Sequence, residues 1–369
     1  MITDNQVRGP LSLYQRVFGS GGVLETNLIH QSRKDGSFPP GHNGPYNHIE
    51  TPVRNTSHWI VALSEMSRGS RSPAVDRALD SAVEYLLSGI CRPGGFTFHC
   101  RDAENRDKAN GLIGQAWAME ALIHASQAMR RLDLLEEAHR LYSLHRWNSA
   151  ENAWEIRDIF GESNGLDTTF NHQLWFAAIA SMLGDDAINQ RVKSFISANL
   201  AHVALYRDGI IYHLGGRLVN TKRKQLPDLT ASAIRAAKNA IRWGLKSRFR
   251  AKSAGYHSFN LLALVILSET MPGLHFWESG TFESLIEPLT SERHLEEVSR
   301  SKYGFKYNLS GFEYAVVAAK FGLPNSVAQD WSDAQEVVTP LDAGIFGLET
   351  WDRWTSLARL YEIRYLRGA

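Results

Sequence analysis

Residues 109–126 read ANGLIGQAWAMEALIHAS, a short polar loop followed by a segment that is apolar on almost every side. The same design returns at residues 167–183, DTTFNHQLWFAAIASML, where a polar first turn again leads into an apolar body. A surface helix keeps one polar face, so a helical segment without such a face predicts a helix that is buried on most sides. Two buried helices of one design predict a repeated architecture.

The same pattern occurs at four further places along the chain, which are residues 51–66, 256–269, 310–322 and 350–365. Amphipathic helices with a charged face lie between them, at residues 12–20, 72–89, 133–145 and 185–200. Buried inner helices that alternate with amphipathic outer helices, each with one solvent-exposed face, predict an all-α protein of the α/α-toroid type. Short β-hairpins are expected only in long loops, at residues 96–100, 206–216 and 303–309.

The composition fits one globular chain rather than a fibrous, disordered or disulfide-stapled one. Of 369 residues, 43% are hydrophobic and 21% are charged, and the formal net charge is +1. We therefore expect one toroid domain over residues 1–369 and no nucleic-acid partner. The first residues lack a signal-peptide pattern, and the longest apolar run, residues 261–267, is too short to cross a bilayer. These features predict a cytoplasmic protein, in which Cys91 and Cys100 are reduced thiols.

One segment departs from this balance. Residues 217–252 contain eleven basic residues and one acidic residue, Asp228, and form a basic insertion in the predicted domain. The first interpretation is an outer helix at residues 229–249 with a solvated basic face. The alternatives are peripheral contact with the anionic inner face of a membrane, or contact with an acidic polymer.

The inner helices of such a toroid are parallel, so their N-terminal ends gather at one mouth and add positive potential there. Candidate acids and bases at these ends are Asp167, Glu50, His58, His172 and Glu313. Asp167 also fits a helix N-cap, and Glu50 also fits an ion pair with Arg54. A metal site at His42, His48, Glu50 and His58 lacks any recognised spacing, so no metal is expected.

Other residues at the same helix starts are candidates for binding a substrate. Amides and cations suit sugar hydroxyls and acidic groups, and aromatic rings suit the apolar faces of sugars. The candidates are Arg54, Trp59, Lys108, Asn110, Gln115, Trp117, Asn171, Trp175, Tyr256, His257, Asn260, Tyr307, Trp351 and Arg353. The sequence has no GxGxxG after a strand, no GxxxxGK[ST] and no GxSxG, so no cofactor is expected.

Three stretches, NGLIGQAWAMEAL, DTTFNHQLWFAA and HIETPVRNTSHW, resemble the α/α-toroid carbohydrate-active superfamily. That superfamily includes unsaturated glucuronyl hydrolases, N-acylglucosamine epimerase-like isomerases and polysaccharide lyases. The resemblance implies an enzyme acting on an oligo- or polysaccharide. A glycoside hydrolase that works through two carboxylates is the first hypothesis, with Arg54 and Lys108 holding an acidic sugar.

Two alternatives stand beside the hydrolase. One is a sugar epimerase or polysaccharide lyase that abstracts a proton next to a carboxylate, with a histidine or tyrosine as the base. The other is a non-catalytic toroidal binding protein in polysaccharide assembly or export.

Overall fold

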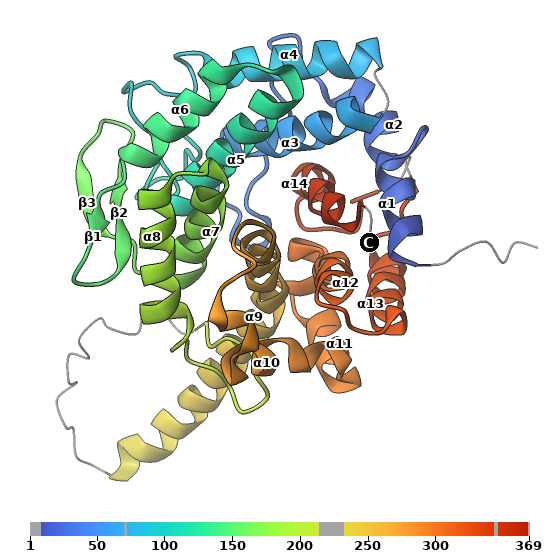
Figure 1. Ribbon diagram of the computed structural model, residues 1–369. Helices are drawn as coiled ribbons and strands as arrows, with labels where there is room; N and C mark the ends of the chain where they lie inside the picture. The colour runs from blue at the N-terminus through green and yellow to red at the C-terminus, as the bar shows by residue number, and fades with distance from the viewer. Residues whose placement is uncertain (1–8, 70–71, 214–231, 343–345, 368–369) are drawn as a thin grey trace, which may run out of the picture.

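The computed structural model describes residues 9–69, 72–213, 232–342 and 346–367, without the side chains of residues 29 and 232–248. Helices form a ring, seen along its axis in Figure 1. The inner helices are α3 (Val53–Gly69), α5 (Gly111–Met129), α7 (Phe170–Ala180), the C-terminal half of α9 (Ser232–Thr270), α12 (Ser310–Lys320) and α14 (Arg353–Arg359). Each inner helix from α3 to α12 contacts the next, α12 contacts the turn that follows α14 (residues 360–366), and α14 with this turn closes the ring against α3. The prediction of an α/α toroid is confirmed.

The inner helices are as buried as their sequences predict. Every residue from Gly111 to Ser126 in α5 is buried, and so is every residue from Val53 to Met66 in α3. The outer helices are α1 (Pro10–Phe18), α2 (Val23–Gln31), α4 (Pro73–Leu87), α6 (Leu132–Ser143), α8 (Asp186–Phe195), α10 (Gly280–Ile286), α11 (Glu292–Arg300) and α13 (Asn325–Val338). The outer helices bury only one stripe, as Val75, Leu79 and Leu86 do in α4. Apolar burial on this scale is the main stabilising contribution to the ring.

The fourth inner helix differs from the prediction. We expected it to begin near Tyr256, after a separate outer helix, but α9 runs without a break from Ser232 to Thr270. No proline interrupts residues 250–256, and Gly255 continues the helix while lying close against Tyr303. Residues 217–231 of the predicted insertion lie outside the described residues, and 232–252 belong to α9, whose N-terminal part projects from the ring (Figure 1).

The β-structure also differs from the prediction. A three-stranded antiparallel sheet is formed by β1 (Trp147–Asn148), β2 (Ala153–Arg157) and β3 (Ser163–Leu166), in that order. Residues 96–100 form no strand, and residues 304–308 form a π-helix turn. The hairpin predicted at 206–216 is described only as far as residue 213, and there Ile211 forms an isolated bridge with Leu205. Gly161, with φ of 87°, allows the turn between β2 and β3, a position that we did not identify in the sequence.

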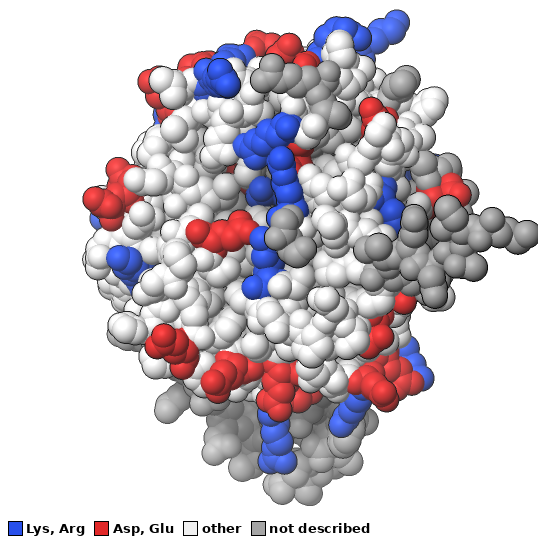
Figure 2. Space-filling model, turned by 45° about the vertical axis from the view of Figure 1, so that its right-hand side comes forward, with Lys and Arg blue, Asp and Glu red and all other residues white. Residues whose placement is uncertain are grey.

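Charged side chains of both signs are interspersed on the molecular face in Figure 2, where a short row of basic side chains has acidic ones beside it. Among the described residues, no helix is both long and apolar enough to span a membrane. Cys91 and Cys100 are free thiols, and both are buried. Burial raises the pKa of the Cys91 thiol to about 11 and also raises the pKa of Cys100.

Candidate functional site

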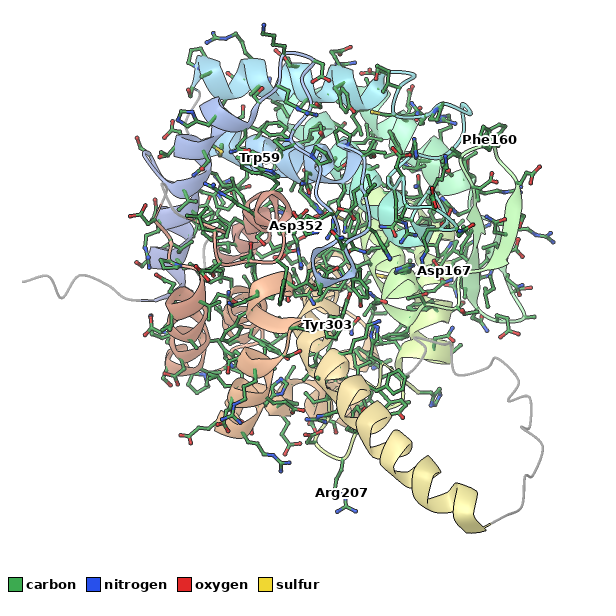
Figure 3. The ribbon with its side chains drawn as sticks, turned by 180° about the vertical axis from the view of Figure 1, so that it is seen from behind. Trp59, Phe160, Asp167, Arg207, Tyr303 and Asp352 are labelled. Carbon is green, nitrogen blue, oxygen red and sulfur yellow. The ribbon has the colours of Figure 1, made fainter. Side chains whose placement is uncertain are left out.

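A cavity of about 200 Å³ opens where the N-terminal ends of the inner helices meet. In Figure 3, which shows the ring from behind, Asp167, Tyr303 and Asp352 lie around its centre, whereas Phe160 lies at the outer edge on the turn between β2 and β3. The cavity is lined by Asn43, Tyr46, His48, Arg54, Arg101, Asn110, Ile113, Trp117, Thr169, Asn171, His172, His213, Lys252, Tyr256, Phe259, Tyr307, Asn308 and Arg359.

His172 is the one residue of α7 that is not buried, and it faces this cavity. Its Nδ1 lies 3.0 Å from Oδ2 of Asp167, which leaves Nε2 as the free ring nitrogen. The Asp167 carboxylate also accepts the amide N–H groups of Leu112 and Thr169, both at 3.0 Å. Burial acts to raise the pKa of Asp167, but the charge and hydrogen bond of His172 and the two amides together lower it. Asp167 thus orients the imidazole as an ionised carboxylate.

Gly111 makes room for this Asp–His pair. Its φ is 58°, and a Cβ at this position would lie 2.6 Å from Asp167 Oδ2 and 2.7 Å from His172 Nδ1. A glycine is therefore required here both by backbone conformation and by space. Asp107 stabilises the same turn, because its carboxylate accepts the N–H groups of Ala109 and Gly111.

The charge of the cavity wall is positive. Arg54, Arg101, Lys252 and Arg359 line it, and its described lining residues include neither Asp nor Glu. The nearest carboxylates that we predicted as acids lie behind cations: Glu50 Oε1 accepts from Arg54 at 2.9 Å, and Glu313 accepts from Arg359. Burial raises the pKa of Glu50, and it raises the pKa of Glu313 to about 8.

Aromatic rings and histidines complete the wall. The turn η1 (Gly44–Tyr46) brings Tyr46 to within 3.1 Å, hydroxyl to hydroxyl, of Tyr256, and Gly44 is needed because a Cβ there would lie 2.2 Å from the Tyr307 ring. Burial, together with Arg101 and Arg106, lowers the pKa of His48.

His213 stacks on the ring of Tyr256 with 4.6 Å between centroids. Burial, and then the charge of Lys252, lower the pKa of His213 to about 3, so this imidazole is neutral at physiological pH.

Of the predicted site residues, seven line the cavity: Arg54, Asn110, Trp117, Asn171, His172, Tyr256 and Tyr307. Three more, Glu50, Asp167 and Glu313, are each one hydrogen bond behind a lining residue. The other nine do not line the cavity: His58, Trp59, Lys108, Gln115, Trp175, His257, Asn260, Trp351 and Arg353.

Several of these nine have other contacts that occupy them. Trp59 stacks on Phe38 and Trp175 on Phe259, both at 4.6 Å and both fully buried, so neither ring offers a face to a ligand. Gln115 bonds the backbone of Phe98 and Ala109.

The remaining residues of this group are held elsewhere in the structure. His257 bonds the Leu285 carbonyl at 2.9 Å and accepts from the Ile211 amide at 3.3 Å. His58 and Asn260 are buried, Lys108 and Trp351 are exposed, and the guanidinium of Arg353 lies over the Trp354 ring.

The prediction missed Arg359, Lys252, Arg101 and His213. Arg359 lies more than two turns after Thr350, where the sixth predicted segment begins, so it falls outside the first-turn candidates, and Lys252 was assigned to the basic insertion. Arg359 is the last residue of α14, and its guanidinium donates to Asn308 of the π-helix turn at 2.9 Å, whereas the unbroken α9 carries Lys252 into the wall. No motif in the sequence marks either residue.

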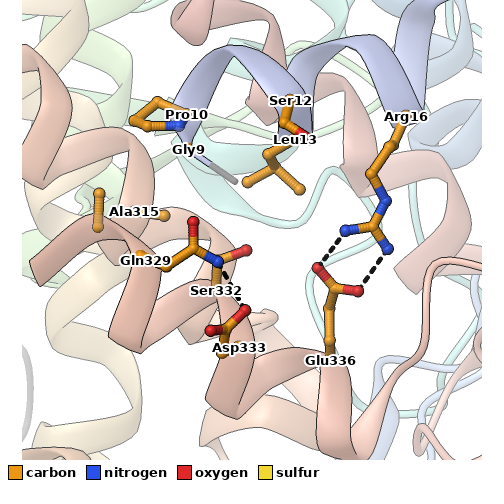
Figure 4. A pocket seen from close by; sticks show the side chains of 11 residues that line it. Gly9, Pro10, Ser12, Leu13, Arg16, Ala315, Gln329, Ser332, Asp333 and Glu336 are labelled. Carbon is orange, nitrogen blue, oxygen red and sulfur yellow. Dashed lines mark hydrogen bonds and ion pairs between the residues drawn. The ribbon is translucent and has the colours of Figure 1, made fainter. Parts of the chain in front are cut away.

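Among the described residues, no group of three or more His, Cys, Asp or Glu side chains is arranged to hold a metal ion. A second hollow of about 280 Å³ lies on the outside of the ring, between α1 and α13 (Figure 4). The Arg16 guanidinium in it binds both carboxylate oxygens of Glu336, at 2.7 and 2.5 Å. Among the residues that the structure describes, this hollow therefore presents no unpaired cation, in contrast to the mouth cavity.

Solved structures of carbohydrate enzymes share this fold. Cellobiose 2-epimerase from Bacillus thermoamylovorans has a TM-score of 0.65 and 11% identity, covering 98% of this chain and 99% of that one. A D-mannose isomerase has a TM-score of 0.62 and 10% identity, covering all of both chains. An unsaturated glucuronyl hydrolase specific for heparin has a TM-score of 0.56 and 13% identity, covering 97% and 95%. The protein is thus an α/α toroid of the six-hairpin type found in carbohydrate enzymes.

The sequence comparison is more specific. The chain is 34% identical over 343 residues to archaeal glycosylation protein Q of Haloferax volcanii, which covers 89% of this chain and 92% of that protein. The chain belongs to the family of archaeal glycosylation protein Q. No model in the collection of protein families matches the sequence.

Proposed function

We propose that the protein is a sugar-modifying enzyme of a glycosylation pathway that epimerises an acidic sugar at the carbon next to its carboxylate. His172 is the base in this proposal, Asp167 positions it, and Arg54 and Arg101 bind the sugar carboxylate. The observation that carries the proposal is the Asp167–His172 pair in a cavity whose described wall has four cations and no carboxylate. The name of the Haloferax relative supports the pathway.

The chemistry follows from these groups. Nε2 of His172 takes the proton from the carbon beside the carboxylate, and the C–H electron pair moves into that carboxylate to give an enediolate. Guanidinium groups at the carboxylate stabilise the charge that develops there. A proton delivered from solvent to the opposite face of the enediolate gives the epimer. His172 then releases to solvent the proton that it took from carbon.

The cavity suits this reaction better than the hydrolysis that we first expected. A glycoside hydrolase places two carboxyl groups against the bond that is cleaved. Glu50, Asp167 and Glu313 are all engaged by protein groups that lie between them and the cavity. The lyase alternative begins with the same proton abstraction, so the products distinguish it from epimerisation.

The test is mass spectrometry and NMR of glucuronate and of short uronic-acid oligosaccharides incubated with the protein in D2O. We expect an intact sugar that gains one carbon-bound deuterium, and an exchange rate that falls about 10²–10⁴-fold in His172→Gln. Unsaturated fragments would assign a lyase, and fragments that gain water would assign a hydrolase.

Asp167→Asn tests the positioning role, because an amide keeps the size of the side chain but not its charge. We expect kcat for exchange to fall while KM changes little, since Asp167 does not touch the ligand. Lys108→Met is the matched control, because Lys108 is exposed and lies outside the cavity wall. Exchange that is unchanged in both His172→Gln and Asp167→Asn would contradict the mechanism.

A further inference from the structure

The four cations of the cavity wall differ in whether the protein neutralises them. Arg54 is paired with Glu50 at 2.9 Å, and Arg359 is paired with Glu313 and with Glu362, the latter at 3.0 Å. Within the described residues, no carboxylate lies in ion-pair reach of Arg101 or Lys252. Two positive charges of the cavity thus have no ion-pair partner among the described residues, and Arg101 feels the carboxylates of Asp107 and Glu50 only from beyond ion-pair distance. A partly buried cation without a partner loses hydration without gaining an ion pair, so it is a site where a ligand can supply the charge.

The two unpaired cations lie in different sectors of the mouth. Arg101 precedes α5, beside the bridge that its backbone forms with Glu50, and its Nε and Nη2 donate to the carbonyl of Asp107 at 3.1 and 3.0 Å. Lys252 comes from α9, which is separated from α5 around the ring by α7. Arg101 is therefore next to Arg54, whereas Lys252 belongs to a separate group of residues.

The surroundings of Lys252 form a polar pocket of their own. Its ammonium lies 5.3 Å from the ring centroid of Tyr46 and 5.6 Å from that of Tyr256, which is one helical turn further along α9. The hydroxyls of these two tyrosines are 3.1 Å apart and share one hydrogen bond. Tyr303 and Tyr307 lie within hydrogen-bond range of the same two hydroxyls, so the four tyrosines form one hydroxyl cluster beside the ammonium, which offers both donors and acceptors to a ligand. Burial, and then Lys302, lower the pKa of Lys252, as expected of an ammonium without a counter-ion.

We propose that the substrate carries a second anionic group, a phosphate ester, and that Lys252 with the hydroxyls of Tyr46 and Tyr256 binds it while Arg54 and Arg101 bind the carboxylate. A phosphate has several acceptor oxygens and up to two charges, which matches an ammonium and a phenol O–H. The substrate class is thus an acidic sugar phosphorylated at a position away from its carboxylate. The assignment of the carboxylate to the arginine end rests on the proposed function.

The experiment measures calorimetric Kd values in a two-by-two set of ligands. Glucose has neither charge, glucuronate has the carboxylate, glucose 1-phosphate has the phosphate, and glucuronate 1-phosphate has both. Lys252→Met should weaken the two phosphate-bearing ligands about tenfold or more and leave glucuronate within about twofold. Arg101→Gln should weaken the binding of the two carboxylate-bearing ligands and leave the Kd of glucose 1-phosphate nearly unchanged. Lys108→Met should leave the Kd of all four ligands unchanged.

The pattern of losses decides the outcome. Lys252→Met that weakens glucuronate and glucuronate 1-phosphate equally, or weakens neither, would overturn the proposal. Wild-type protein that binds glucuronate 1-phosphate no more tightly than glucuronate would overturn it as well. A fifth ligand, UDP-glucuronate, distinguishes a phosphate that belongs to a diphosphate-linked donor from that of a simple sugar phosphate, according to which of the two binds more tightly.

Binding and catalysis are scored separately. The proposed epimerisation is read from carbon-bound deuterium, and the second anionic subsite is read from Kd. If the variants lose affinity selectively for one charged group but no deuterium exchange occurs, the proposed phosphate subsite stands and the proposed epimerase activity is wrong. If glucuronate exchanges deuterium but Lys252→Met binds the phosphate-bearing ligands as tightly as the wild type does, the proposed epimerase activity stands and the proposed phosphate subsite is wrong.

Discussion

The two ends of the toroid contain the same kinds of charged residue, but these residues differ in whether they form ion pairs within the protein. Away from the mouth, Glu120 accepts from Arg364 at 3.4 Å and from the Tyr361 hydroxyl at 2.9 Å. Glu65, on the last part of α3, is shared by Arg367, Arg68 and Tyr14. At the mouth, two cations of the cavity wall lack such partners among the described residues.

This difference teaches how to separate structural from functional charge in one fold. A buried charge that the protein neutralises contributes to a folded network, and removing one partner destabilises the fold. A charge that the protein leaves unneutralised beside a cavity costs stability and is compensated only when a ligand binds. Loss of one partner of a buried pair should therefore cost more stability than loss of an unpaired charge.

The largest effect is expected from Arg359→Met, because it leaves Glu313 and Glu362 buried without their cation. The free energy of unfolding should fall by about 3 kcal/mol or more. Urea denaturation checks this, with Arg101→Gln as the matched variant of an unpaired arginine, which should cost less than about 1 kcal/mol. Equal losses in the two variants would remove the distinction between paired and unpaired cations.

The buried histidines of the ring predict a dependence of stability on pH. Burial lowers the pKa of His257 and of His145 to about 4 in the folded protein, from an ordinary value of 6.5. Between these values the unfolded chain binds more protons, so stability is complete above about pH 6.5 and falls as the pH drops toward 4. The loss is on the order of 3 kcal/mol for each group.

Thermal unfolding between pH 7.5 and 5 measures this slope. His257→Gln should be less stable at pH 7.5, because it loses the bonds to Leu285 and Ile211, but its stability should depend less on pH. A variant with the same pH slope as the wild type would show that His257 does not contribute through its protonation.

Tyr361→Phe sharpens the comparison at the paired end. It removes the hydroxyl that donates to Glu120 and should cost about 1 kcal/mol of unfolding free energy. Deuterium exchange into the sugar should stay within about twofold of the wild type, because Tyr361 does not line the cavity. A large loss of exchange with intact stability would instead connect this network to the site.

The smallest effect has the opposite sign. Lys252→Met should raise the stability of the ligand-free protein by about 0.5 kcal/mol, because it replaces an unpaired, partly buried ammonium by an apolar side chain of similar length. Urea denaturation of this variant beside Lys108→Met gives the comparison. A loss of more than about 1 kcal/mol would mean that Lys252 has a structural role.

Most of the ring could be predicted from the sequence, because inner helices carry their burial on all sides and outer helices on one. Residues 111–126 show this most clearly, and they are buried without exception. The start predicted at Tyr256 differed because its polar residues resemble a helix beginning, whereas the preceding residues 250–255 continue the helix. Local pattern alone does not decide between a polar helix start and a polar turn of a longer helix.

The candidate site was predictable only in part. Residues in the first turns, such as Arg54, Asn110 and His172, line the cavity because parallel inner helices converge there. Trp59, Trp175 and His257 stand near similar starts but point into packing contacts, since successive residues of a helix face directions about 100° apart. Which of these side chains points into the cavity depends on how the neighbouring helices pack.

The amino-acid sequence by itself determined the buried inner helices, apart from the beginning of α9, and the mouth at which their polar ends meet, because these follow from local periodicity and apolar burial. Only the tertiary structure decided which polar groups have partners. Asp167 reaches Leu112, Arg359 reaches Glu313, and Tyr46 reaches Tyr256 across 55, 46 and 210 positions of the chain. Pairing of charges depends on atoms a few ångströms apart in space, and the sequence does not express that distance.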